Sequence, residues 1–406
     1  MTERINLVPK RRFKEFQNTR AWEQRKLGEV ADIIGGGTPS TSNEEYWNGD
    51  IDWYSPVEIG ELTYIDSSQK KITELGLQKS SAKILPIGTV LFTSRAGIGN
   101  TAILAKEGAT NQGFQSIVPH RDKLDSYFIY SRTHELKRYG EINGAGSTFL
   151  EVSGKQMAKM PMLIPILKEQ KKIGGFFERL DYLIAIHQRK LEKTKALKSA
   201  YLSEMFPAEG EREPKRRFAG FTQTWEQEKL SEVTDVYDGT HQTPDYKNEG
   251  IMFLSVENIK TLQSKKYISK EAFESEFKVS PEKGDILMTR IGDIGTANVV
   301  ESDEPIGYYV SLALLKKKKL NSYFLQASIH SPAMQGEIYK RTLHIAFPKK
   351  INKNEVEDVP IRFPNDAEQT KIGDFFKSLD YLIALHQRKL EKLRNIKKAY
   401  LHEMFV

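Results

Sequence analysis

Two long stretches of the chain carry the same hydrophobic pattern. Residues 165–206 and 364–405 place apolar side chains alternately three and four positions apart, which is typical of a helix that packs along a seam. The seam positions are Ile173, Phe177, Leu180, Ile184, Leu191, Tyr201 and Met205, and then Ile372, Phe376, Leu379, Ile383, Leu390, Tyr400 and Met404. Some 35 helical residues at about 1.5 Å each span roughly 50 Å. Because a solitary helix would leave this seam in water, we expect the two helices to pack antiparallel as a coiled-coil spacer.

The two stretches are copies of one sequence. Of 42 aligned positions, 28 are identical, and the repeat period is 199 residues. A second repeat precedes each body: the basic run 9–13 returns at 214–218, and the Trp-Glu-Gln run that begins at Trp22 returns at Trp225. Such a period is too long for a solenoid unit and indicates a duplicated domain with its helix. A duplicated chain can form a pseudo-twofold object, which suits a twofold partner such as duplex DNA.

Between these repeats lie two bodies of mixed α and β pattern that resemble each other much less. Short apolar runs at 90–92 and 286–288 are of strand type, and residues 126–139 and 322–338 are plausible short helices. The sequence therefore predicts a mixed α/β (α+β) fold with two globular bodies joined by two long helices. The predicted divisions are a first body at 1–164, a first helix at 165–207, a second body at 208–363 and a second helix at 364–406.

Composition narrows the class of protein. A net charge of +7 and a pI of about 9.1 favour an anionic partner, nucleic acid first, but only weakly. The absence of cysteine excludes disulfides, thiolate zinc sites and cysteine nucleophiles. No apolar run approaches the ~18–20 residues that cross a bilayer, and the first residues lack the apolar core of a secretory signal. We expect a cytoplasmic protein without a membrane partner.

Catalytic motifs are missing from the sequence. It contains no phosphate-binding loop, no nucleophile elbow and no zinc-protease helix, and the Gly35–Gly37 run is not followed by the helix that a dinucleotide site requires. Two Glu-x-Lys triplets, at 135–137 and 276–278, fit the end of some nuclease sites but arise by chance in so charged a chain. His187 and His386 lie on the helical seam, either as a metal pair or, as we favour, as neutral packed side chains. We expect a binding protein that is not an enzyme and that holds no metal or cofactor.

Two equivalent corners are candidate contact surfaces. Residues 88–99 match residues 284–295 without a gap, and each segment runs from a strand into hydroxyl and arginine side chains and then glycines. Glycine permits close approach of backbone, and arginine commonly binds guanine edges or phosphates. The alternative is an ordinary strand–turn–strand corner with an exposed arginine. The candidate contact residues here are Thr93, Ser94, Arg95, Thr289 and Arg290.

Amide, hydroxyl and lysine side chains extend these candidates. Asn111, Gln112 and Gln115 can pair with adenine, although a turn with satisfied amides accounts for them equally well. In the second body, Thr240, His241, Gln242, Tyr308 and Tyr309 occupy comparable places. Lysines that could neutralise phosphates are Lys70, Lys71, Lys265, Lys266 and the run 316–319, which is otherwise a solvated strand end.

Taken in order, these motifs resemble the specificity (S) subunit of type I restriction–modification enzymes over essentially the whole chain. The resemblance rests on the W-E-x-x-K-L-x-E-V runs, the G-G-T-P-S turn at 36–40, the two corners, the N-Q-G-F-Q run at 111–115 and the E-Q-x-K-I-G-x-F-F helices. The turn adds Thr38 and Ser40 to the candidate contacts. The second body departs from the pattern because it lacks N-Q-G-F-Q and has Gly-Thr-His-Gln-Thr-Pro at 239–244.

The resemblance implies a role in DNA recognition. Each body would be a target recognition domain that reads one half of a bipartite, asymmetric DNA site, and the helices would fix the gap between the halves. Two methyltransferase (M) subunits would dock on the helices, and restriction (R) subunits would join that core. S-adenosylmethionine, ATP and Mg would belong to those partners, and this chain would be non-catalytic. Two other hypotheses stay open: a stand-alone DNA nuclease or methyltransferase, and a structural coiled-coil adaptor.

Overall fold

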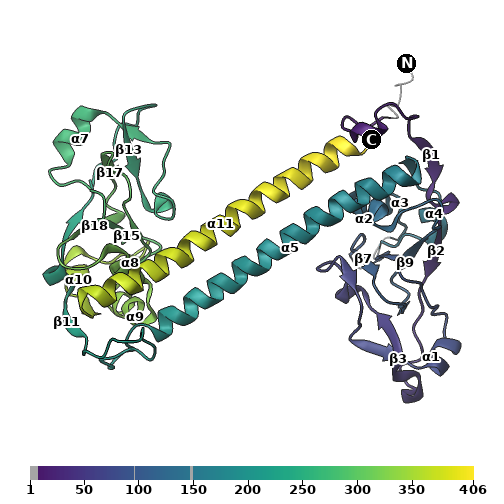
Figure 1. Cartoon of the computed structure of the whole chain (residues 1–406), viewed down its shortest axis with the longest axis horizontal. Helices are drawn as coiled ribbons and strands as arrows, with labels where there is room; N and C mark the ends of the chain where they lie inside the picture. The colour runs from purple at the N-terminus through teal and green to yellow at the C-terminus, as the bar shows by residue number, and fades with distance from the viewer. Residues whose placement is uncertain (1–7, 96, 147–149) are drawn as a thin grey trace. The chain divides into compact units, whose positions relative to one another are not determined.

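The computed structural model describes residues 8–95, 97–146 and 150–406, and the chain divides into two compact units (Figure 1). Unit 1 comprises Met1–Ile186 together with Leu390–Val406, and unit 2 comprises His187–Lys389. The first residues of the predicted first body, 1–7, lie outside the described part, as do residues 96 and 147–149. Both long helices are divided between the units, so the four-segment division stays a prediction about sequence segments.

The two long helices form where the hydrophobic pattern predicts them. They are α5 (Leu167–Glu204) and α11 (Asp366–Met404). In unit 1, Phe177 of α5 stacks on Phe405, which directly follows α11, with 5.7 Å between ring centroids, and Asp181 accepts a hydrogen bond from Lys397. Since the partner number falls as the α5 number rises, the helices run antiparallel there.

The same packing recurs in unit 2. Tyr201 of α5 packs edge-on against Phe375 of α11 at 5.1 Å, and Lys198 pairs with Asp380. The order of partners again shows an antiparallel pair. The seam positions that are buried are Ile173, Phe177, Leu180, Leu191, Met205, Ile372, Phe376, Leu379, Leu390 and Met404, whereas Ile184, Tyr201, Ile383 and Tyr400 are half-buried. Each unit therefore completes its core with the start of one helix and the end of the other.

Unit 1 is built on a twisted five-stranded sheet and two smaller sheets. The large sheet has the order β2 (Ala31–Gly35), β9 (Gln115–Pro119), β6 (Val90–Phe92), β7 (Thr101–Leu104) and β4 (Tyr64–Ile65). A second sheet contains β5 (Lys70–Ile72), β3 (Trp47–Tyr54) and β8 (Ala109–Thr110), and β1 (Glu23–Lys26) pairs with β10 (Pro161–Ile164). The short helices are α1 (Glu74–Gln78), α2 (Ser126–Ser131), α3 (Thr133–Asn143) and α4 (Gly154–Ala158), with 3₁₀ turns η1 (Lys14–Phe16), η2 (Leu27–Glu29), η3 (Glu44–Tyr46) and η4 (Pro56–Glu58).

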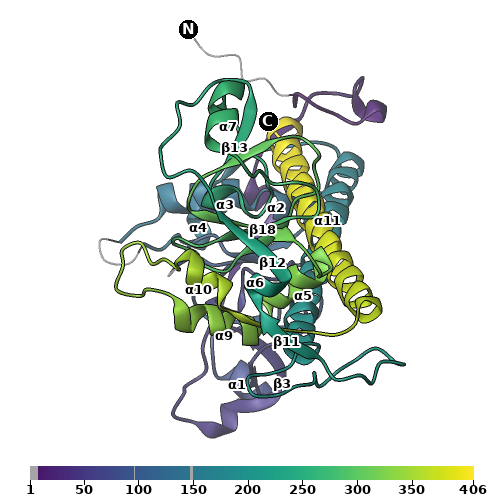
Figure 2. The same ribbon diagram turned by 90° about the vertical axis from the view of Figure 1, so that its left-hand side faces the viewer.

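Unit 2 repeats this plan with fewer strands (Figure 2). Its large sheet has the order β12 (Thr234–Asp238), β18 (Leu312–Lys317), β15 (Ile286–Thr289) and β16 (Ala297–Val299). The second sheet contains β14 (Tyr267–Ile268), β13 (Ile251–Leu254) and β17 (Ile306–Tyr308), and β11 (Glu226–Lys229) pairs with β19 (Pro360–Phe363). The short helices are α6 (Leu230–Val233), α7 (Lys270–Glu276), α8 (Ser322–His330), α9 (Pro332–Arg341) and α10 (Lys353–Glu357), with one 3₁₀ turn, η5 (Val256–Asn258). The mixed α/β prediction is confirmed.

Each predicted short helix of the bodies is in fact two helices. The first pair breaks at Arg132 and the second at Ser331. Ser331 caps α9 by accepting a hydrogen bond from the backbone N–H of Met334, and Pro332 occupies the first turn. Because proline cannot continue the preceding helix, a cap followed by proline ends α8 and starts α9. Within the described part of the chain, no helix has an apolar stretch of the length and purity needed to cross a membrane.

Candidate nucleic-acid interface

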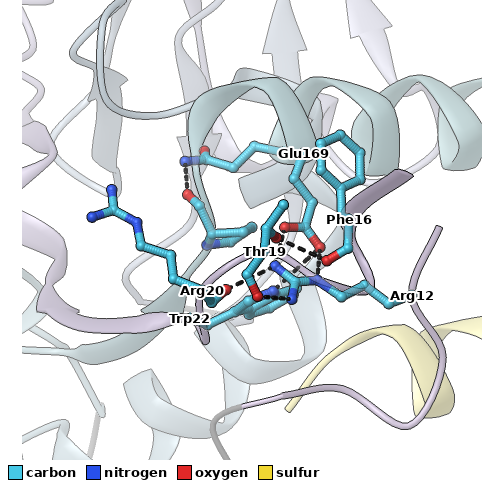
Figure 3. Close-up of polar contacts among 8 residues, drawn as sticks. Arg12, Phe16, Thr19, Arg20, Trp22 and Glu169 are labelled. Carbon is cyan, nitrogen blue, oxygen red and sulfur yellow. Dashed lines mark hydrogen bonds and ion pairs between the residues drawn. The ribbon is translucent and has the colours of Figure 1, made fainter. Parts of the chain in front are cut away.

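A buried ion pair attaches the basic lead-in of unit 1 to the start of α5 (Figure 3). The Arg12 guanidinium donates two hydrogen bonds to the Glu169 carboxylate, at 2.7 and 2.6 Å, and both side chains are almost fully buried. It also donates to the backbone carbonyls of Thr19 and Arg20, at 3.2 and 3.0 Å. The Trp22 indole lies 3.4 Å from the same carboxylate. This bidentate geometry fixes the chain where it enters the body.

Unit 2 has the same attachment. Arg217 binds Glu368 through hydrogen bonds of 2.8 and 2.7 Å and donates to the carbonyl of Gln223 at 2.6 Å. The hydrogen bond to Glu368 raises the pKa of Arg217 above its ordinary value. One difference is that the Trp225 indole N–H has no partner among the described residues. The repeated basic lead-in therefore has a structural role in both units, which leaves the divergent bodies to differ in function.

The corner at 88–99 is a tight turn that its own side chains hold. The Thr93 hydroxyl donates to the carbonyl of Gly97 at 2.7 Å and accepts from the backbone N–H of Asn100 at 2.9 Å. Gly97 and Gly99 have positive φ angles of 106° and 100°, which only glycine adopts without strain. Thr93 is fully buried, so its hydroxyl holds the turn and faces no ligand.

The two corner arginines lie in different environments, contrary to the expectation of equivalent arginine tips. Ser94 and Arg290 occupy the same position, since each N–H donates to the carbonyl of the neighbouring strand, Gly113 at 2.8 Å and Ser311 at 2.9 Å. Arg95 is therefore equivalent to Ile291, one residue later. Because neighbouring residues of an extended chain point to opposite faces, this offset turns one arginine outward and the other inward.

The different burial of the two corner arginines follows from that one-residue offset. Arg95 is half-buried, and its guanidinium is 4.0 Å from the Glu151 carboxylate. Arg290 is 7% exposed and forms an ion pair with Asp238, and desolvation lowers its pKa. Its equivalent Ser94 is buried with no partner for the hydroxyl among the described residues, and Thr289, like Thr93, is buried and bonded to its own turn. Only Arg95 of the five corner candidates faces solvent.

The predicted amide and hydroxyl residues of unit 1 gather beside Arg95. The Thr38 hydroxyl donates to the Gln112 side chain, and the Asn111 side chain accepts from the N–H of Gly113 at 2.7 Å. A Cβ placed on Gly113 would lie 3.7 Å from Nε of Arg95. Residues distant in sequence thus form one polar group with an exposed Gln112 at its centre.

Two tryptophans that the sequence analysis did not single out extend this group toward Lys70. Trp53 donates from its indole to the carbonyl of Gly37 at 2.8 Å, and Trp47 packs edge-on against it at 5.2 Å. Trp47 in turn donates to the carbonyl of Ser40 at 3.1 Å, and the Lys70 ammonium lies 5.8 Å from its ring. We name this continuous surface strip 1; its members are Lys70, Trp47, Ser40, Thr38, Gln112, Asn111 and Arg95. The two tryptophans at 47 and 53, followed by the lysine pair at 70–71, are the signal that could have found it.

Two other candidates of unit 1 lie outside strip 1. Lys71 forms an ion pair of 3.3 Å with the buried Asp52, which also accepts hydrogen bonds from Ser68. Gln115 begins β9 and pairs with Gly35, and a Cβ on Gly154 would lie only 2.7 Å from its side-chain oxygen. Both side chains already have neighbours within the fold.

In unit 2 the predicted residues occupy the equivalent turn. The N–H of Thr240 donates to the carbonyl of Tyr308 at 3.1 Å, as that of Gly37 donates to Thr110 in unit 1. Thr240 is buried and its hydroxyl donates to Glu276, while the buried Tyr308 donates to the carbonyl of Asp238. The exposed members of this turn are His241 and Gln242, with Tyr309 half-buried behind them.

The lysine–aromatic stack also recurs in unit 2. The Lys266 ammonium lies 5.4 Å from the Tyr246 ring, and Tyr246 packs against Phe253 at 5.8 Å. Lys266 also forms a 2.8 Å ion pair with Glu257, and this hydrogen bond raises the pKa of Lys266. Lys265 is exposed beside it. We call this surface of unit 2 'strip 2'. Its members are Lys265, Lys266, Tyr246, Tyr309, His241 and Gln242.

Comparison with known proteins now identifies the family. The model of the type I restriction modification DNA specificity domain matches twice, at residues 19–196 and 222–395. The chain belongs to this family. The two matches fall on the two halves that the sequence repeat defines, so the chain holds two specificity domains.

Individual specificity subunits agree with this assignment. The chain is 37% identical over 166 residues to the specificity subunit of the type I restriction enzyme MjaIX from Methanocaldococcus jannaschii, a match that covers 40% of this chain and 38% of that protein. The MjaVIII specificity subunit of the same organism is 21% identical over 408 residues, which cover 96% of this chain and 94% of that protein. A crystal structure of the type I S subunit from M. genitalium has the same fold, with a TM-score of 0.67, 14% identity and coverage of 98% and 99%.

The remaining sequence candidates of this specificity-domain chain have structural partners. His187 and His386 meet with 3.0 Å between their Nδ1 atoms, and desolvation, together with Lys190 and Lys389, lowers the pKa of both. In the described ranges, no three His, Asp or Glu side chains gather as metal ligands.

The glutamates of the two Glu-x-Lys triplets also have partners: Glu135 pairs with Arg132, and Glu276 accepts a hydrogen bond from Thr240. The lysine run at 316–319 forms ion pairs with nearby acids, as a solvated strand end would.

Proposed function

We propose that this chain is the sequence-specific DNA-recognition subunit of a type I restriction–modification complex. Each unit would bind one half of a bipartite, asymmetric target through its own strip. The observation that carries the proposal is that one framework presents two different strips, each with a lysine beside a pair of edge-on aromatic rings and exposed polar side chains. Lysines of this kind neutralise phosphates, and amides, histidine and arginine read base edges.

The contact residues proposed for unit 1 are those of strip 1. Arg95 and Gln112 would meet base edges, since both present polar groups to solvent, whereas Lys70 would meet a phosphate. For unit 2 we propose His241 and Gln242 at bases and Lys265 at a phosphate. The buried candidates Ser94, Thr93, Thr289, Arg290, Thr240 and Tyr308 would position these side chains, because burial prevents contact with a duplex.

The paired helices would set the gap between the half-sites and offer the surface for two methyltransferase subunits, with restriction subunits bound through that core. Support comes from the duplication itself, which presents the same helical sequence twice and so suits two copies of one partner. S-adenosylmethionine, ATP and Mg would be bound by those partners, and methylation of a flipped adenine would occur on the methyltransferase. Purified chain alone should then neither cut nor methylate DNA.

The test is a genome-wide map of adenine methylation, by single-molecule sequencing, after co-expression with a cognate methyltransferase subunit. We expect one bipartite motif with a fixed gap. Methylation without a bipartite motif, or no methylation despite a demonstrated complex, would contradict the proposal. An adaptor with no sequence preference would give the second result.

A further inference from the structure

One loop of unit 2 presents two large apolar side chains entirely to solvent. It joins α9 to α10 and spans residues 343–350. Ile345 is 99% exposed and Phe347 is 103% exposed, more than any other large apolar side chain of the described residues. Exposed single apolar residues are common on protein surfaces, but two such side chains at the tip of one loop form a contact patch that has no role in the fold.

The base of this loop is fixed. The N–H of Leu343 donates to the carbonyl of Lys350 at 2.8 Å, and the N–H of Ile351 donates to the carbonyl of Arg290 at 2.9 Å. The N–H of Gly292 donates to the carbonyl of Lys349 at 2.8 Å. The loop therefore extends directly from the corner at 284–295, because backbone hydrogen bonds join its base to Arg290 and Gly292.

Charge on the loop indicates which partner fits. Lys349 and Lys350 are exposed, and neither forms an ion pair with a described carboxylate. His344 packs against Tyr339 with 4.3 Å between the centroids of the tilted rings. An apolar tip followed by two exposed ammonium groups suits a partner that is apolar between its layers and anionic outside. Stacked base pairs flanked by phosphates have this character.

We propose that Ile345 and Phe347 form a wedge that enters the DNA at the second half-site and packs against a base step, while Lys349 and Lys350 bind the adjoining phosphates. The proposal rests on the DNA-recognition function above and adds the manner of binding. Apolar wedges of this type partly unstack a step and favour sequences that deform easily. A wedge would give unit 2 the selectivity that its buried Arg290 does not provide.

The test uses the full chain assembled with its methyltransferase subunit and a duplex that carries the mapped target. 2-Aminopurine is placed at successive positions of the second half-site, and affinity is measured by fluorescence anisotropy. We expect Phe347→Ala to weaken binding at least about tenfold, in the range of base–aromatic stacking, and to abolish the fluorescence rise that unstacking causes. Phe347→Leu should retain most of both signals. Lys349→Gln with Lys350→Gln should lower the salt slope by about two.

Controls separate the wedge from a folding defect and from a contact with a protein partner. Ile87, which is 60% exposed in unit 1 and is not a member of strip 1, gives a matched control: Ile87→Ala should change neither signal. Since Phe347 has no contact to lose, Phe347→Ala should melt at the wild-type temperature. If Phe347→Ala left both the affinity and the fluorescence unchanged, the wedge would be overturned and the proposed function would stand. If Phe347→Ala bound DNA normally but failed to assemble with the methyltransferase subunit, the wedge would be overturned and the loop would instead be a protein contact. Wild-type protein without target preference would overturn the proposed function and the wedge together.

Discussion

Removal of the buried Arg12 guanidinium should destabilise unit 1 selectively. Arg12→Ala leaves the Glu169 carboxylate, which is 0% exposed, without its bidentate partner and deprives two backbone carbonyls of a donor. Breaking such a buried pair costs about 3–5 kcal/mol, because the remaining charge is neither solvated nor paired. For a unit of about 200 residues, each kcal/mol lowers the melting temperature by about 2–4 °C, so the expected shift is roughly 6–20 °C.

Differential scanning calorimetry of the full chain measures this effect. We expect two transitions, one for each unit, since each unit has its own core. Arg12→Ala should lower one transition, and Arg217→Ala, which breaks the equivalent pair with Glu368, should lower the other. The neighbouring Arg11 is the control, because its pair with Glu403 is largely exposed and exposed pairs contribute little.

Two outcomes would refute the reasoning. Equal shifts from Arg11→Ala and Arg12→Ala would show that burial of the pair is irrelevant. Movement of both transitions by Arg12→Ala would show that the ion pair stabilises the whole chain and not unit 1. Arg12→Lys should lie between Arg12→Ala and wild type, since an ammonium keeps the charge but loses the second hydrogen bond.

Three further predictions address recognition, spacing and pH. Arg95→Ala should weaken discrimination in one half-site only, by about 1–3 kcal/mol, in a binding series over single-base variants; a uniform loss would make Arg95 a phosphate contact. A seven-residue insertion after Lys193, matched in the facing part of α11 to keep the seam in register, should lengthen the methylated gap and leave both half-sites unchanged; altered half-sites would contradict the spacer. His187 and His386 have lowered pKa values in the fold, so their neutral forms are favoured there. The unfolded chain then binds more protons, and the stability of unit 2 should be complete above about pH 6.5 and fall as the pH drops below it. Replacement of both histidines by glutamine should flatten that dependence in calorimetry between about pH 5 and 7.5.

The sequence predicts the helices well because their signal is local. Periodic apolar residues over some 40 positions leave few alternatives, and α5 and α11 begin and end within two residues of the repeated segments. The breaks at Arg132 and Ser331 are not predicted, although Ser331-Pro332 is a cap followed by proline. The helical period across 322–338 predicts a single helix there, but the local stop signal divides it.

The candidate site is harder to predict because it depends on contacts across sheets. The sequence indicates Asn111, Gln112 and Thr38 separately, and only the fold brings them beside Arg95 and Trp47. By contrast, the difference between Arg95 and Arg290 is present in the ungapped alignment, which places Arg290 opposite Ser94. Treating the two arginines as equivalent ignores the alternation of side chains in extended chain.

Under the proposed function, this one-residue offset would give the two units different means of recognition. In unit 1, the guanidinium of Arg95 and the amide of Gln112 are available to base edges, so direct hydrogen bonding can distinguish bases there. In unit 2, the corner arginine, Arg290, lies one position earlier and binds Asp238. The loop that extends from that corner has Ile345 and Phe347 at its tip. Selectivity through an apolar tip depends on how readily a base step deforms, not on its hydrogen-bonding groups. Under the proposed function, one duplicated framework would read an asymmetric target, because the two halves share a scaffold while a one-residue offset along a strand changes which side chains are exposed.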